Sequence, residues 1–135
     1  MIKSTITATY QSDIETLWKI VTDNSNYAWR SDLSKIVIID DKEFIEYAKN
    51  NFETHFTITA KEEFRFYAFH MRNRNLEGNW RGNFSSLSNG DTQIEFTEEL
   101  TIKNPMVEII AKIFNLIKKM QKTYVVDLRK ALKEN

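Results

Sequence analysis

Glu98 is the side chain in this sequence that is best placed to do chemistry. It alternates with Ile94, Phe96 and Leu100 at the two-residue period of a β-strand, so we expect its carboxylate on the apolar face. A carboxyl group among apolar side chains has a raised pKa, and it can act as a general acid or base or bind a polar group of a ligand. The alternative is that Glu98 lies near a strand end, where water or a salt bridge stabilises it.

His70 and Tyr124 are the other candidates for catalysis. His70 follows Phe66 and Ala68 along one face of an apolar stretch, and Tyr124 lies on the apolar stripe of the C-terminal segment. Either could transfer a proton together with Glu98, although a single histidine in such a place more often has a structural role. The sequence has two His, no Cys and no His-x-x-x-His spacing, so we expect no metal site and no cofactor.

The N-terminal segment predicts one strand followed by two short helices. Residues 2–10 alternate as a strand does, and Ser12 and Glu15 then have the spacing of a helix capping box. The amphipathic segment that follows predicts the first helix. We expect a second short helix at residues 25–29, anchored by its two aromatic side chains.

Residues 35–102 predict about six further strands joined by hairpins. Turn signals stand at Asp40-Asp41, Asn50-Asn51 and Asn89-Gly90, with alternating apolar residues between them. Strands joined by hairpins pair antiparallel, and strands that are separated from the helices along the chain indicate the α+β class. The whole chain therefore predicts a curved antiparallel sheet of about seven strands.

One long amphipathic helix is expected to begin at Asn104-Pro105 and to end near Lys133. Its apolar residues recur at the spacing of a helix that buries one face. They are Met106, Ile109 or Ile110, Ile113, Ile117, Met120, Tyr124, Leu128, and Ala131 or Leu132. A helix of this length that covers the concave side of a curved sheet can enclose a space.

The side chains expected around this space are mostly aromatic or aliphatic, with a few polar atoms, which is typical of a ligand pocket. The expected ligand-binding residues are Tyr27, Trp29, Phe56, Trp80, Phe84, Phe96, Glu98, Ile113, Ile117 and Tyr124. The alternative is that these side chains fill an ordinary core. Arg30 and Asp32, next to Trp29, predict a surface ion pair at the rim of the space.

Composition excludes several classes of protein. The 135 residues carry 19 Lys and Arg against 19 Asp and Glu, so no net charge favours nucleic acid. The segment after Met106 is basic, which suits contact with solvent or with an anionic partner.

No apolar run has the length of a membrane span or the form of a secretion signal, so we expect a cytoplasmic protein without stable membrane insertion. Residues 1–135 predict a single domain.

Four segments resemble a known superfamily. They are the opening STITATYQSDIETLWKIVTDNSNYAWRSDL, the middle NLEGNWRGNF, the strand TQIEFTEEL and the terminal YVVDLRKAL. Together they resemble the START-like group, also called SRPBCC or birch-pollen-allergen-like, and within it the polyketide cyclase/dehydrase-type branch. The resemblance covers essentially the whole chain. It implies the helix-grip fold, with a cavity between sheet and long helix, and it carries over no invariant catalytic set.

Three functions follow as hypotheses. The first is binding of a small hydrophobic ligand (a lipid, quinone, aromatic or polyketide-like molecule) in that cavity, without catalysis. The second is a cyclase/dehydrase-type enzyme that uses Glu98 as acid or base. The third is a protein- or membrane-interaction module with a filled core, whose partner would be a protein, an anionic membrane or a second copy of the chain.

Overall fold

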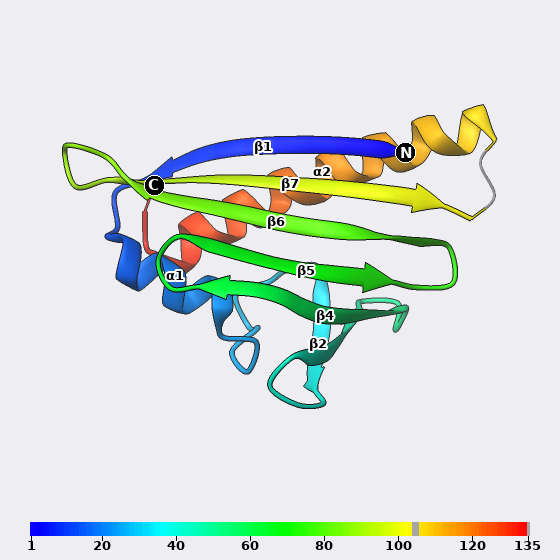
Figure 1. Ribbon diagram of the computed structural model, residues 1–135, viewed down its shortest axis with the longest axis horizontal. Coiled ribbons are helices and arrows are strands. Elements are labelled where there is room, and N and C mark those ends of the chain that lie inside the picture. The colour runs from blue at the N-terminus through cyan, green and yellow to red at the C-terminus, as the bar shows by residue number, and fades with distance from the viewer. Residues whose placement is uncertain (104–105, 135) are drawn as a thin grey trace.

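A seven-stranded antiparallel sheet curves around one long helix in the computed structural model (Figure 1). The structure describes residues 1–103 and 106–134. The elements in chain order are β1 (Ile2–Tyr10), α1 (Ile14–Thr22), β2 (Leu33–Ile38), β3 (Glu43–Ala48), β4 (Glu53–Glu62), β5 (Phe66–Arg72), β6 (Leu76–Ser86), β7 (Thr92–Ile102) and α2 (Val107–Ala131). The strand order β1-β7-β6-β5-β4-β3-β2 confirms the α+β helix-grip architecture.

Tight hairpins set the register of the sheet. Asn51 has a φ of 66° and Gly90 a φ of 91°, so the expected Asn50-Asn51 and Asn89-Gly90 turns both use the left-handed region. Cross-strand pairs then place Phe56 opposite Met71, and Trp80 opposite Glu98. Because successive side chains of a strand point to opposite faces, this register decides which residues face α2.

The segment between β1 and β2 corrects two expectations. Asp13, not Ser12, caps α1, and its carboxylate accepts a hydrogen bond from the Thr16 N–H at 2.8 Å. The second short helix at residues 25–29 is wrong, because only turns follow α1 here. The Asp23 side chain accepts from the N–H and the hydroxyl of Ser25, and such local bonds favour a turn over a helix.

The long helix α2 lies across one face of the sheet, as Figure 1 shows. Its expected start at Asn104-Pro105 lies outside the described residues. Ile117 and Leu128 are buried, and the Tyr10 hydroxyl on β1 donates to the Val125 carbonyl at 2.9 Å. Among the described residues, neither helix has the length and apolar character needed to span a membrane.

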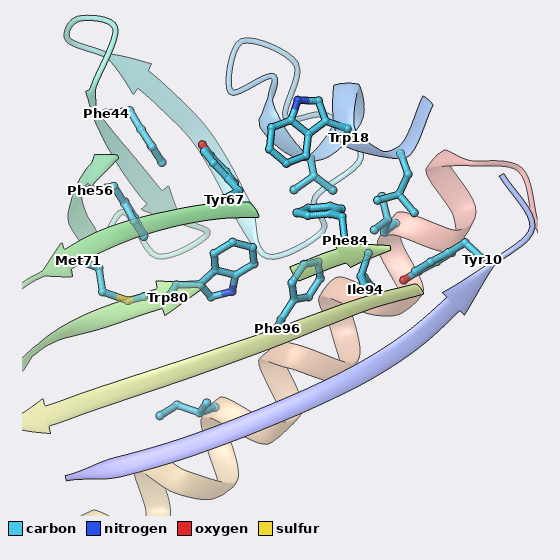
Figure 2. Close-up of a cluster of buried hydrophobic side chains, with 14 of the residues drawn as sticks. Tyr10, Trp18, Phe44, Phe56, Tyr67, Met71, Trp80, Phe84, Ile94 and Phe96 are labelled. Atoms are coloured by element: carbon cyan, nitrogen blue, oxygen red, sulfur yellow. The ribbon is translucent and has the colours of Figure 1, made fainter. Parts of the chain in front are cut away.

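The end of the molecule near α1 is closed by a packed core. Trp18 on α1 meets the Phe84 ring on β6 edge-on at 4.9 Å between ring centroids, and Figure 2 shows the pair next to each other. Tyr10, Ile94 and Leu128 beside them have no exposed surface. Close packing of this kind fixes the position of α2 at its C-terminal half and leaves no room for a ligand there.

The two edges of the sheet differ in character. β1 forms one edge, where α2 packs against it. β2 forms the other edge, and three aliphatic side chains at its end and directly after it are about half exposed, namely Val37, Ile38 and Ile39. Charged residues flank this stretch on both sides, with Lys35 before it and Asp40 and Asp41 after it.

Candidate ligand-binding cavity

A cavity of about 670 Å³ lies between the concave face of the sheet and α2. Strands β3 to β7 provide its floor, and Ile113, Ile117 and Tyr124 on α2 provide its roof. Exposed lining residues mark its mouth at the end away from α1, among them Leu116, Met120, Lys49, Asn50 and Asn75. A core filled by its own side chains, which was one of the expectations from the sequence, is therefore not what the structure has.

Aromatic rings cross the cavity floor from strand to strand. Phe44 stacks on Phe56 with 4.9 Å between centroids, and Phe69 stacks on Trp80 at 4.7 Å. Trp80 in turn contacts Phe96 at 4.7 Å. Figure 2 shows Phe56, Trp80 and Phe96 along the same face of the sheet. The row follows from the register, because each strand contributes its aromatic residues at alternate positions.

Arg30 brings positive charge to the wall of the cavity. Its guanidinium donates two hydrogen bonds to the Asp32 carboxylate, at 3.1 and 3.0 Å, and a second ion pair joins Nη1 to the Glu46 carboxylate at 3.5 Å. It also lies 4.9 Å from the centre of the Tyr124 ring. Burial alone would lower the pKa of Arg30, but the two carboxylates outweigh it and raise that pKa. The surface ion pair expected at the rim is instead a mostly buried three-residue cluster.

Glu98 faces the cavity from β7, and its cross-strand neighbour is Trp80. No described residue forms a hydrogen bond or ion pair with its carboxylate. Burial raises its pKa to about 7, and the negative charge of Glu46 adds to this effect, while Arg30 opposes it. Glu98 therefore exchanges protons near neutral pH and has hydrogen-bonding capacity left for a ligand.

Two tyrosines complete the polar part of the lining. Burial raises the pKa of Tyr124 well above its usual range, so its hydroxyl stays protonated, and no described residue forms a hydrogen bond with it. The Tyr67 hydroxyl accepts a hydrogen bond from Asn24 at 3.2 Å, and burial raises its pKa as well. Tyr124 therefore offers the cavity a hydrogen-bond donor, and Glu98 offers it an acceptor.

The structure brings most of the expected ligand-binding residues to this cavity. Those that line it are Phe56, Trp80, Phe96, Glu98, Ile113, Ile117 and Tyr124. Trp29 stands behind the wall and meets the Tyr124 ring edge-on at 5.2 Å, and Phe84 belongs to the closed core. Tyr27 is not among the lining residues either.

His70 is not brought together with Glu98 or Tyr124. It lies on the opposite, convex face of the sheet, where its ring nitrogens are 2.9 Å from the Glu77 carboxylate and 3.3 Å from the Asn79 side chain. Its neighbours Phe69 and Met71 on β5 take the cavity side instead. Both faces of β5 are apolar, so the sequence of this strand could not predict which of its side chains point to the concave side of the sheet.

Glu46, Tyr67, Phe69, Met71, Leu116 and Met120 line the cavity without having been predicted for it. Glu46 carried a signal, because it alternates with Phe44 and Ala48 on β3 as Glu98 does with its neighbours. Burial raises the pKa of Glu46 too, against the opposing effect of Arg30. Within the described part of the chain, no group of three His, Asp or Glu side chains could hold a metal ion.

No family model and no curated protein matches the sequence of this chain. Solved structures do match its fold. A START superfamily protein from Mycobacterium smegmatis is 15% identical with a TM-score of 0.75, over 96% of this chain and 93% of that one. The Zhui aromatase/cyclase from Streptomyces sp. R1128 is 10% identical with a TM-score of 0.82, over 98% and 93%.

The protein XoxI from Bacillus cereus matches over the full length of both chains, with 13% identity and a TM-score of 0.80. Identities this low establish the fold alone. The chain thus has the START-like helix-grip fold, which it shares with aromatase/cyclases, and the family resemblance of its four sequence segments agrees with that fold.

Proposed function

We propose that this protein binds a small hydrophobic molecule, such as a lipid, quinone, aromatic or polyketide-like compound, in the cavity between the sheet and α2. The observation that carries the proposal is the cavity itself. Its volume of about 670 Å³ falls in the range of small-molecule sites, and its walls are largely aromatic and aliphatic.

The arrangement of the polar groups supports the same proposal. Pockets for small ligands combine apolar walls with a few polar groups that fix the orientation of the ligand. Here the apolar rings cover the floor, whereas Glu98, Tyr124 and the Arg30 cluster gather at one side. A ligand would bury its apolar body on the rings and place its polar group there.

Native mass spectrometry of detergent-free protein, with organic extraction of any bound molecule, tests this proposal first. Titration with an apolar fluorophore then measures the cavity directly. Replacing Ile113 by Trp puts a bulky side chain into the roof of the cavity, and we expect it to weaken fluorophore binding at least about tenfold. Val126→Trp is the matched control, because Val126 is an exposed position on the same helix outside the cavity.

The two variants also separate the possible outcomes. Loss of binding in Ile113→Trp but not in Val126→Trp supports the proposal. A protein that carries no extractable molecule and binds no fluorophore contradicts it, as does equal binding by the two folded variants.

A proton-transfer enzyme of the cyclase/dehydrase type is a second candidate. The observation that favours it is the Glu98 carboxyl, since burial raises its pKa to about 7, where a general acid or base works best. Tyr124 would act as a proton donor in the same space. Once a bound molecule is identified, Glu98→Gln should abolish its turnover, and unchanged turnover would exclude Glu98 from the chemistry.

A further inference from the structure

The charges along the cavity wall are unbalanced. Asp32, Glu46 and Glu98 contribute three carboxylates to the lining, and Arg30 is the cationic group that bonds to two of them. Lys49, the other basic lining residue among those described, is an exposed residue at the mouth. The inner wall therefore keeps a net negative charge whenever Glu98 is ionised.

The positive charge of Arg30 is already compensated by two carboxylates. Its guanidinium donates two hydrogen bonds to the Asp32 carboxylate and forms an ion pair with the Glu46 carboxylate. A carboxylate entering the cavity would face Glu98 and Glu46 without a free cation to bind, and the apolar surroundings strengthen that repulsion. The wall thus disfavours fatty acids and other anionic amphiphiles.

Aromatic residues neighbour Glu98 on the sheet. Trp80 is its direct cross-strand neighbour, Phe96 lies two residues before it on β7, and the Tyr124 ring meets the Phe96 ring edge-on at 5.2 Å. The faces of aromatic rings attract cations, and a carboxylate beside them adds a counter-ion. An ammonium group on an apolar body fits this combination better than a neutral or an anionic group does.

We propose that the ligand of this cavity carries a positively charged amine on its hydrophobic body, and that Glu98 is the counter-ion of that amine. This proposal rests on the proposed function, because it names the class of molecule that the same cavity takes. Glu98 recognises the ammonium group by charge and hydrogen bonding, and the aromatic floor holds the rest of the molecule.

Three probes with the same apolar body test the proposal, namely 2-naphthylethylamine, 2-naphthylethanol and 2-naphthylacetate. Their affinities are measured by calorimetry near pH 8, roughly one unit above the pKa of about 7 that burial gives Glu98. We expect the amine to bind about tenfold or more tightly than the alcohol, and the acetate to bind more weakly than both.

Glu98→Gln should remove the preference for the amine while leaving the affinity for the alcohol within about threefold. Alcohol binding by this variant also shows that its cavity is intact. Glu95→Gln is the matched control, because Glu95 is an exposed residue on the same strand and should change nothing.

The results distinguish the two proposals. If the alcohol binds as tightly as the amine, or if Glu98→Gln keeps the preference for the amine, the cavity still binds hydrophobic molecules and the amine proposal is overturned. If none of the three probes and no apolar fluorophore binds, both proposals fail.

Discussion

Ser4 and Gln121 exchange two hydrogen bonds between β1 and α2, although 117 residues separate them in the sequence. The Ser4 hydroxyl donates to the Gln121 side-chain carbonyl at 2.7 Å, and the Gln121 amide donates to the Ser4 backbone carbonyl at 3.0 Å. Both residues are buried. This pair fixes α2 to the edge of the sheet at one wall of the cavity, because Gln121 also lines it.

Gln121→Ala should therefore destabilise the protein. The variant leaves the Ser4 hydroxyl and carbonyl buried without these partners, and we expect a loss of about 2 kcal/mol in the free energy of unfolding. Urea denaturation measures the loss. Lys122→Ala, at the exposed neighbouring position, is the control and should stay within about 0.5 kcal/mol of the wild type. Equal stability of the two variants would contradict the role given to the pair.

Arg30→Met should cost more than Gln121→Ala. It leaves Asp32 and Glu46 without their cation in a mostly buried site, and removing one partner of such a cluster costs about 3 kcal/mol. Adding Glu46→Gln to Arg30→Met should restore part of that loss, since one uncompensated charge disappears. Thermal unfolding of the two single variants and the double variant checks this coupling, and strictly additive losses would disprove it.

Glu98 should make stability fall as the pH rises. Burial raises its pKa from the ordinary 4.5 to about 7, so the folded protein holds a proton that the unfolded chain has released between these two values. The free energy of unfolding should therefore decrease across that window, by on the order of 3 kcal/mol in total.

Glu98→Gln isolates this contribution, because Gln does not titrate. We expect the variant to gain stability relative to the wild type as the pH rises from about 4.5 to 7, and to be the more stable protein near pH 8. Urea denaturation at several pH values measures the difference. Parallel pH profiles for the two proteins would show that the Glu98 pKa is not raised by burial.

Gly78 should tolerate no side chain. A Cβ there would overlap the Glu99 carbonyl oxygen and lie 2.8 Å from the Leu100 Cα, and these backbone atoms cannot move aside cheaply. We expect Gly78→Ala to cost about 3 kcal/mol. Gly90→Ala is the comparison, because a Cβ at Gly90 meets nothing and only its φ of 91° is strained, at roughly 1 kcal/mol. Equal melting temperatures for the two variants would contradict this assignment.

The strands and the long helix could be predicted from the sequence because their signals are local. The alternation of apolar and polar residues predicted that Glu98 shares a face with Phe96 and Leu100, and that face lines the cavity. The second short helix failed for a local reason too, since the bonds from the Asp23 side chain to Ser25 favour a turn.

The cavity wall could be predicted only in part because it depends on partners that are distant in the chain. The Arg30 cluster needs Glu46 from β3, and nothing in the neighbourhood of Arg30 indicates that third residue. His70 lies on β5, which is apolar on both faces, so the sequence of this strand does not show which face points to the cavity. Met71 pairs with Phe56, which lines the cavity, and His70 next to Met71 therefore points to the opposite face. The pairing register between strands, and not the two-residue period within one strand, decides which side chains of such a strand face the cavity.

The free edge at β2 has a consequence for the behaviour of the protein in concentrated solution. Val37, Ile38 and Ile39 follow one another there about half exposed, and an unpaired strand edge with aliphatic side chains is a template for aggregation. Lys35 on one side and Asp40 and Asp41 on the other act as charged gatekeepers against such stacking. Asp40 also has a structural role, because its carboxylate accepts hydrogen bonds from the Lys42 and Glu43 N–H groups, both at 2.8 Å, in the turn between β2 and β3. We therefore expect that neutralising Lys35 and Asp41, and leaving Asp40 in place, lowers the solubility of the folded protein without removing these turn bonds.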